Sequence, residues 1–223
     1  MAYILNIETA TKNCSVAIAK DGNTIYCREG AELGYSHAEK LHVFIKEALQ
    51  QTALAFKDLS AIAVSQGPGS YTGLRIGISA GKGLCFALDI PLISINTLAI
   101  LAEQVHITDG VIIPLIDARR MEAYSAIFDV EKNQIRDVQA EIITETSFNE
   151  IHSKIYLAGD CLDKCRAVLL NERFVFLDEI VYPSAKDMSN LSYEKYKKDD
   201  TVDVAYFEPY YLKDFISTVK KLS

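Results

Sequence analysis

Hydrophobic residues in the first part of the chain form short alternating or continuous stretches, which predict three strands, a helix and then two strand–helix units. The Asp21-Gly22 pair between the second and third stretches is typical of a hairpin turn. Ser36, followed three residues later by Glu39, forms a capping box where a helical apolar period begins. The predicted strands cover residues 3–7, 14–19, 24–27, 61–64 and 92–95, and the predicted helices cover residues 36–53, 72–88 and 97–105.

The second part of the chain repeats this order weakly. Glu8 ends the first strand of one half and Asp117 ends that of the other, and each is followed by a short polar link into another strand. We therefore expect two lobes, an N-terminal lobe of residues 1–105 and a C-terminal lobe of residues 106–223. The strands expected in the second lobe cover residues 111–116, 123–128, 135–143, 155–158 and 174–177, and its helices cover residues 162–170 and a segment from about 184.

Charge is unevenly divided between the halves. The 223 residues carry a net charge of −7, yet residues 1–104 contain 8 basic and 9 acidic side chains, so most of the charge lies in the second half. An acidic chain has no broad electrostatic attraction for nucleic acid. A half so poor in charge favours association with another chain, and a larger core is the alternative explanation.

The cysteines predict a reducing compartment. The five thiols are odd in number and scattered through apolar segments, and Cys161 and Cys165, one helical turn apart, have no nearby histidine that would complete a metal pattern. We expect these two to pack in the core. No uncharged apolar run approaches the length of a membrane span, and the start lacks a basic, apolar leader, so a soluble cytoplasmic protein is expected.

Residues 67–83 are rich in glycine and form the most informative segment. The glycines before Thr72 allow a tight strand-to-helix turn whose amides could meet an anion. Glycines inside a helix cost about 1 kcal/mol each, so Gly77 and Gly81, with Ala80, predict a closely packed face. The spacing up to Lys82 does not match a phosphate-binding P-loop. Arg75 and Lys82 are equally consistent with binding a phosphate or partner carboxylate and with being solvated.

No catalytic or metal centre is visible in the sequence. His37 and His42 are five residues apart and diverge by about 140° on a helix, whereas a two-histidine site on one helix needs a spacing of four. There is no G-x-S-x-G, H-E-x-x-H or convincing Cys/His pair. We therefore expect neither catalytic residues nor a bound metal.

Several motifs together resemble the TsaB (YeaZ) family, the paralogue of the TsaD tRNA-modification enzyme. The most specific is Gly67-Pro68-Gly69-Ser70-Tyr71-Thr72-Gly73-Leu74-Arg75-Ile76-Gly77. The other matching segments are residues 4–11, 14–18, 36–41, 80–84, 90–98, 117–124 and 209–212, whereas residues 125–205 match only in layout.

The resemblance implies a duplicated α/β fold of the actin-like (ASKHA, ribonuclease H-like) class, with two lobes of mixed sheet plus helices. It further implies a non-catalytic scaffold or activator that TsaD requires to add threonylcarbamoyl to N6 of adenosine 37 in tRNAs reading codons that begin with A. TsaD-like proteins carry H-x-x-x-H, and here Leu41 stands where the second histidine would follow His37. Glu8 and Ala10 also depart from the D-x-G of nucleotide-hydrolysing relatives.

The partners that the resemblance implies are a TsaD homologue, a TsaE-type P-loop ATPase, a second copy of the chain when alone, and tRNA only through the complex. The chain would have no cofactor of its own, and ATP or ADP would lie at the junction with TsaD. The expected interface residues are Ser36, His37, Glu39, Leu41, Thr72, Gly73, Arg75, Ile76, Gly77, Ala80 and Gly81, and the residues expected near a nucleotide are Glu8, Thr11, Gly69, Ser70 and Thr72.

Two enzyme hypotheses stay open beside this one. A free-standing actin-like ATPase or phosphotransferase would use Glu8 and the turn from Gly67 to Thr72. A metal-dependent peptidase is disfavoured by the histidine spacing.

Overall fold

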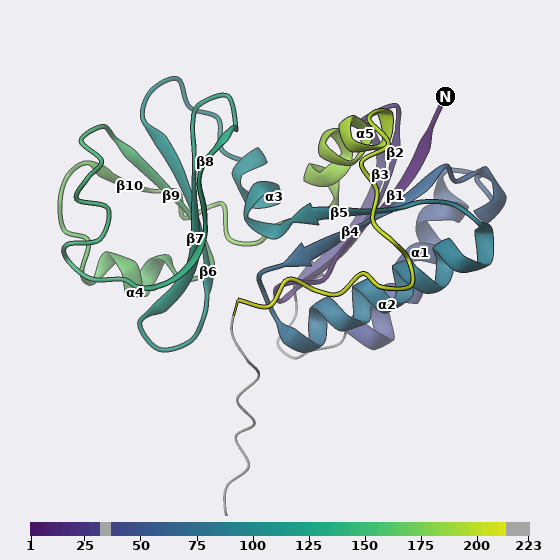
Figure 1. Cartoon of the computed structure of the whole chain (residues 1–223), viewed down its shortest axis with the longest axis horizontal. Coiled ribbons are helices and arrows are strands. Elements are labelled where there is room, and N and C mark those ends of the chain that lie inside the picture. Colours follow the sequence, from purple (N-terminus) through teal and green to yellow (C-terminus); the bar gives the residue numbers. More distant parts are fainter. Residues whose placement is uncertain (32–36, 213–223) are drawn as a thin grey trace, which may run out of the picture.

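The computed structural model describes residues 1–31 and 37–212, and its backbone forms two lobes that lie side by side (Figure 1). The first lobe contains β1 (Tyr3–Glu8), β2 (Asn13–Lys20), β3 (Asn23–Ala31), α1 (His37–Gln51), η1 (Phe56–Asp58), β4 (Ala61–Gly67), α2 (Tyr71–Leu88) and β5 (Leu92–Asn96). After α3 (Thr97–Glu103) come β6 (Val111–Asp117), β7 (Glu122–Phe128), β8 (Gln134–Ile142), β9 (Ile155–Gly159), α4 (Leu162–Arg166), β10 (Phe174–Phe176), η2 (Ala185–Met188) and α5 (Ser189–Lys197).

The two five-stranded sheets have the same topology. The first has the strand order β3-β2-β1-β4-β5 and the second β10-β9-β6-β7-β8, the same order read from the other edge. In each sheet three consecutive strands pair antiparallel and the remaining two join by parallel pairing. The duplicated mixed-sheet α/β fold predicted from the sequence is confirmed.

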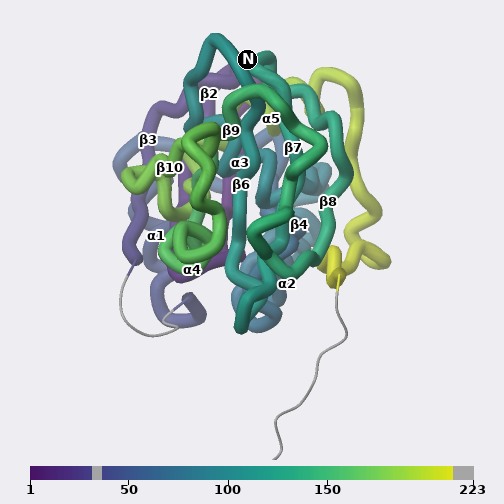
Figure 2. The backbone as a smooth tube through the Cα atoms, turned by 90° about the vertical axis from the view of Figure 1, so that its left-hand side faces the viewer, coloured from purple at the N-terminus to yellow at the C-terminus, as the bar shows by residue number. Residues whose placement is uncertain are grey.

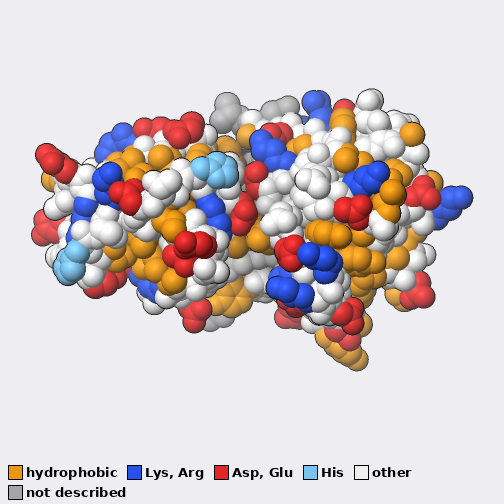
Figure 3. Space-filling view, turned by 90° about the horizontal axis from the view of Figure 1, so that it is seen from above, with side chains coloured by type: hydrophobic (Ala, Val, Ile, Leu, Met, Phe, Trp, Pro, Cys, Tyr) orange, Lys and Arg blue, Asp and Glu red, His pale blue; other side chains and the backbone are white. Residues whose placement is uncertain are grey.

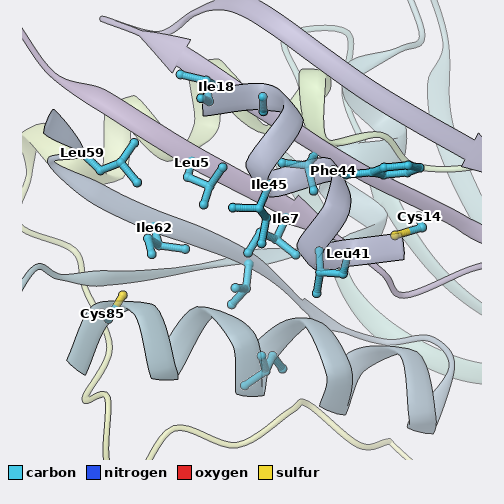
Figure 4. Packing of buried hydrophobic residues seen from close by; sticks show 14 of the residues in the cluster. Leu5, Ile7, Cys14, Ile18, Leu41, Phe44, Ile45, Leu59, Ile62 and Cys85 are labelled. Atoms are coloured by element: carbon cyan, nitrogen blue, oxygen red, sulfur yellow. The ribbon is translucent and has the colours of Figure 1, made fainter. Parts of the chain in front are cut away.

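The main core of the first lobe lies between its sheet and the layer formed by α1 and α2. Leu5 and Ile7 of β1 lie close to Leu41 and Ile45 of α1 in this core (Figure 4). All four side chains are buried. The three- and four-residue apolar spacing of α1 therefore creates the stripe that covers this face of the sheet.

The opposite face of the first sheet is covered by η2 and α5. Met188 and Ala185 pack against Ile4 and Ile93 of the sheet. The last described segment then crosses over α2 (Figure 1) and runs down one side of the molecule (Figure 2). Segments from residue 185 onward, which the sequence analysis assigns to a lobe of residues 106–223, thus contact the first sheet. Both faces of the sheet are thus covered by residues distant in sequence. The α2 side carries Ile62 and Leu92, and the other side carries Ile4 and Ile93.

Helix α3 lies between the lobes and contributes to both cores (Figure 1). Ile100 packs in the cluster of the first sheet, whereas Leu98 and Leu101 pack with Ile112 and Phe128 of the second. One apolar helix therefore fixes how the two sheets meet.

Helix α4 is shorter than expected. The sequence predicts a helix to residue 170, but it ends at Arg166. The chain must turn into β10, and the Asn171 side chain accepts a hydrogen bond from the Arg173 amide at 3.0 Å in that turn. Cys161 and Cys165 pack in the core of the second lobe, as predicted.

Helix α2 lies against the chain that follows β1, at a distance only glycine permits. A Cβ at Gly73 would lie 2.1 Å from the Thr9 carbonyl oxygen, and one at Gly77 would lie 2.2 Å from the Thr9 hydroxyl oxygen. The Thr9 hydroxyl also donates to the Gly73 carbonyl at 2.8 Å. At Gly81 a Cβ would lie 2.6 Å from a Val64 methyl. The predicted close packing is confirmed, but the neighbouring backbone belongs to this chain.

We expect Gly73→Ala to lower the free energy of unfolding by about 2 kcal/mol, because the new methyl meets a main-chain oxygen that has no room to move. Gly83→Ala on the same helix is the matched control, since a Cβ there meets nothing within 4 Å. It should stabilise the chain by up to about 1 kcal/mol through helix propensity. Urea unfolding monitored by circular dichroism measures both, and equal effects of the two substitutions would contradict the packing described.

Candidate functional site

The carboxyl ends of the central parallel strands in the two sheets border the space between the lobes. Glu8 ends β1 and Asp117 ends β6, and Asp160 follows β9 directly. The positive charge of Lys12, which follows β1, acts on Asp160 of the other lobe, so the two edges are close. In open α/β sheets such edges are where ligands bind.

The carboxyl group of Glu8 is closed off from solvent. It is fully buried, and its Oε1 accepts a hydrogen bond from the Ala10 amide at 2.5 Å. Burial raises the pKa of Glu8 to about 7, although the Ala10 amide and the Ser65 hydroxyl favour the charged form. The sequence places Glu8 near a nucleotide, but here the side chain supports the loop and does not reach solvent.

The turn that begins α2 is occupied by the chain after β1. The Ser70 amide donates to the Ala10 carbonyl at 2.6 Å, and the Gly73 amide donates to the Ser70 hydroxyl at 3.2 Å. A Cβ at Gly69 would lie 2.4 Å from the same Ala10 oxygen. Of the residues expected near a nucleotide, Thr72 alone is exposed, and the turn packs on Ala10 where an anion would have to sit.

His37 links this loop to α1. Its Nε2 pairs with the Thr11 carbonyl at 2.8 Å, and both residues are buried. Burial lowers the pKa of His37, and the charge of Lys40 acts in the same direction. His42 is exposed, so the two histidines diverge as predicted. In the part of the chain that the structure describes, no group of three or more His, Cys, Asp or Glu residues could hold a metal ion.

On the second lobe the corresponding carboxylate is neutralised within the chain. The Lys164 ammonium forms an ion pair with Asp117, and the Asp117 amide donates to Asp160 Oδ1 at 2.8 Å. Burial raises the pKa of Asp160. With Glu8 buried and Ser70 bonded to Ala10, the residues at these strand ends do not fit the phosphates of a nucleotide.

The outer surface of the α1–α2 layer is open. Of the expected interface residues, Glu39, Thr72 and Arg75 are exposed, and Ile76 and Ala80 are half-buried. The other described residues of that set are buried and make contacts within this chain; they are His37, Leu41, Gly73, Gly77 and Gly81. Ser36 lies outside the described residues.

Two exposed apolar side chains on this layer were not predicted. Phe86 of α2 is 86% exposed and Val43 of α1 is 60% exposed. Each lies outside the apolar stripe of its helix, and this position in the sequence could have indicated that the side chain is exposed. Gly83, three residues before Phe86, has open space around its Cα. Gly83 and Phe86, one helical turn apart, therefore make an exposed and sterically open stretch of α2.

The last described segment is fastened to one side of α2. Lys82 donates to the carbonyls of Ala205 and Phe207 at 3.1 and 3.0 Å, and Arg75 donates to the Tyr211 hydroxyl at 3.1 Å. Tyr211 also packs on Tyr71, with 4.9 Å between ring centroids. A groove of about 380 Å³ remains between the segment and the helix. Arg75 and Lys82 thus hold this chain's own C-terminal segment, which neither sequence interpretation foresaw.

Comparison with known proteins gives the family. Residues 32–169 match the family model described as TsaD, tRNA N6-adenosine threonylcarbamoyltransferase. The tRNA threonylcarbamoyladenosine biosynthesis protein TsaB of Escherichia coli is 28% identical over 97% of both chains, and TsaB of Bacillus subtilis is 33% identical over 60% of this chain and 58% of its own length. The chain belongs to the TsaB (YeaZ) family.

Solved structures agree with this family membership. YeaZ from Pseudomonas aeruginosa superposes with a TM-score of 0.83 at 26% identity, covering 95% of this chain and all of the other. An activator of 2-hydroxyisocaproyl-CoA dehydratase from Clostridium difficile, solved with bound ADPNP, has a TM-score of 0.51 at 9% identity and shares the fold alone. None of the helices described in this TsaB-family chain is long and apolar enough to cross a membrane.

The buried Glu8 makes stability depend on pH. Its carboxyl group has a pKa of about 7 in the folded chain against an ordinary value of 4.5, so the folded state binds the proton more tightly. Stability should therefore fall as pH rises from about 4.5 to 7, by about 3 kcal/mol from this group. Glu8→Gln should remove that part of the decline, whereas Glu39→Gln at an exposed site should leave it unchanged. Urea unfolding at pH 5 and pH 8 measures the difference, and parallel declines in all three proteins would contradict it.

Proposed function

We propose that this chain is a non-catalytic subunit of the machinery that makes threonylcarbamoyladenosine in tRNA, and that it supports a TsaD-type transferase. The observation that carries the proposal is the match to TsaB, which extends over 97% of both chains. The partner in this proposal is a transferase of the kind that the matching family model describes. It would carry out the N6-threonylcarbamoylation of adenosine 37.

The cleft supports a role without chemistry. Leu41, which stands where TsaD-like proteins have a second histidine, is buried in the core, and His37 is bonded to Thr11. The Glu8 carboxyl is sealed and Asp117 is paired with Lys164. Glu8, His37 and Asp117 thus each bond to another group of this chain.

The α1–α2 layer is the surface we assign to the partner. Exposed aromatic side chains are enriched at the centre of protein interfaces, and Phe86 is the most exposed side chain among the large apolar residues described. Gly83 beside it lets another backbone approach closely, which offsets its cost to the helix. Exposed Glu39, Thr72 and Arg75 would form a polar rim.

The remaining partners follow from this assignment. A second copy of the chain would use the same layer when the transferase is absent, so homodimer and heterodimer exclude one another. A TsaE-type ATPase and the tRNA would join the assembled pair in the cytoplasm, and ATP or ADP would lie at the junction with the transferase, because this chain's own cleft does not suit phosphates.

Reconstitution tests the function directly. Purified transferase, threonylcarbamoyl-AMP synthase, TsaE-type ATPase and unmodified tRNA are combined with and without this chain, and the modified nucleoside is measured by mass spectrometry. We expect modification to fall at least 10-fold on omission. Undiminished modification would refute the requirement.

Substitution on the layer tests the interface. Phe86→Glu and Val43→Glu should each weaken the complex with the transferase by about 10-fold or more, because a charge is then buried against the partner. The matched control is Leu170→Glu, which changes a side chain on the second lobe that is 82% exposed. Size-exclusion chromatography and calorimetry measure binding, and circular dichroism verifies folding. Equal affinity of Phe86→Glu and Leu170→Glu would place the interface elsewhere.

A further inference from the structure

The turn between β6 and β7 carries two adjacent arginines in an unfavourable backbone conformation. Arg119 has φ of 70° and Arg120 has φ of 53°, the left-handed region that Gly, Asn and Asp adopt most readily. Among the described residues they are the two consecutive non-glycine residues with positive φ. Asn and Gly would be the ordinary choice for such a hairpin turn. The side chains are therefore retained at a cost to the backbone, which points to a use for them.

The turn is held rigidly from below. The Arg119 amide donates to Asp117 Oδ1 at 2.9 Å. Lys164, whose side chain is only 19% exposed, donates to the carbonyls of Arg120 and Glu122 at 3.0 and 2.6 Å and pairs with Asp117. A cation anchored on α4 thus fixes the backbone that presents the arginines, so little order is lost when a ligand binds.

The two guanidinium groups are themselves unengaged. Both residues are exposed, and within residues 1–31 and 37–212 neither side chain has a hydrogen bond or ion pair. On the face seen from above, by contrast, Lys or Arg and Asp or Glu side chains are interspersed over both lobes (Figure 3). Lys12 of the first lobe is also exposed and acts electrostatically on Asp160, at the base of the same turn. Unpaired cations from both lobes therefore gather at this edge of an acidic protein.

The geometry points to the Arg119–Arg120 turn as a contact for the phosphodiester backbone of RNA. Guanidinium groups match the oxygens of a phosphate in bidentate geometry, and a rigid exposed turn reaches a convex polyanion without a groove. A site of two or three cations fits a chain of net charge −7, because it adds a local contact to RNA held mainly by another subunit. The inference rests on the proposed function for the identity of the RNA, which is the tRNA being modified.

The test uses a double variant that combines Arg119→Ala and Arg120→Ala. It is compared with the wild type and with a control double variant that combines Lys154→Ala and Lys197→Ala. The control removes two exposed lysines. Lys154 precedes β9, whose start pairs with the start of β6, so it lies at the opposite end of these strands from the turn. Binding of a fluorescent tRNA transcript is titrated at several salt concentrations, with the assembled transferase complex and with the chain alone at low salt.

We expect the arginine variant to bind tRNA about 10-fold more weakly near 0.15 M salt, with the slope of log affinity against log salt reduced by about 1.5. The lysine control should change both the tRNA affinity and the salt slope by less. A third variant, Arg119→Asn with Arg120→Gly, should lose the same affinity while its thermal midpoint rises by about 2–4 °C, because the turn is relieved of strain. A purely structural role for the arginines would lower both.

Other outcomes overturn the inference, and they distinguish its failure from failure of the proposed function. If wild-type chain supports modification and the arginine variant keeps full tRNA affinity, the inference fails and the function stands. If the variant loses affinity for the transferase instead, the turn binds protein carboxylates, and if calorimetry shows lost binding of Mg-ATP instead, it binds nucleotide phosphates. If no transferase complex forms, the titration of tRNA with the chain alone decides whether the turn contacts RNA. If the wild-type chain binds no tRNA in that titration, the contact is refuted.

Discussion

The contact between Thr9 and the glycine face of α2 is the constraint on which the first lobe depends. Thr9 lies directly after β1, and its carbonyl and hydroxyl occupy the space that side chains at Gly73 and Gly77 would fill. This contact draws α2 onto the sheet, brings Ser70 onto the Ala10 carbonyl and seals Glu8 beneath. The same packing turns the other side of α2 outward, so a closed cleft and an open helix layer have one cause.

The topology was predictable because turns and apolar stretches that are local in the sequence determine it. The Asp21-Gly22 turn and the apolar stretches defined the first three strands, and the likeness of the two halves anticipated the second sheet. Helical glycines signal close approach, but a sequence does not say which backbone approaches, so Gly77 was assigned to a partner instead of to Thr9. Lys164 was missed altogether, because its contacts with Asp117 and Arg120 join segments more than forty residues apart.

The carboxylate at the end of the central strand is compensated differently in the two lobes. In the first lobe burial holds the pKa of Glu8 near neutrality, and in the second lobe the ammonium of Lys164 compensates Asp117. Both devices leave the space between the lobes without a free carboxylate at these two positions, which is the opposite of what a metal–phosphate site needs. The cations that remain unpaired stand at the rim and are therefore available to ligands larger than a nucleotide.

The return of residues 185–197 to the first sheet has a consequence for how the chain matures. Ile4 and Ile93 are made well before Met188, which belongs to the segment that covers them. A nascent chain carries that half of its first sheet uncovered throughout synthesis of the second, which can meanwhile close around its own apolar centre. Loss of residues 185–197 should thus harm the first lobe more than the second, and synthesis of this segment becomes the event that covers the first sheet.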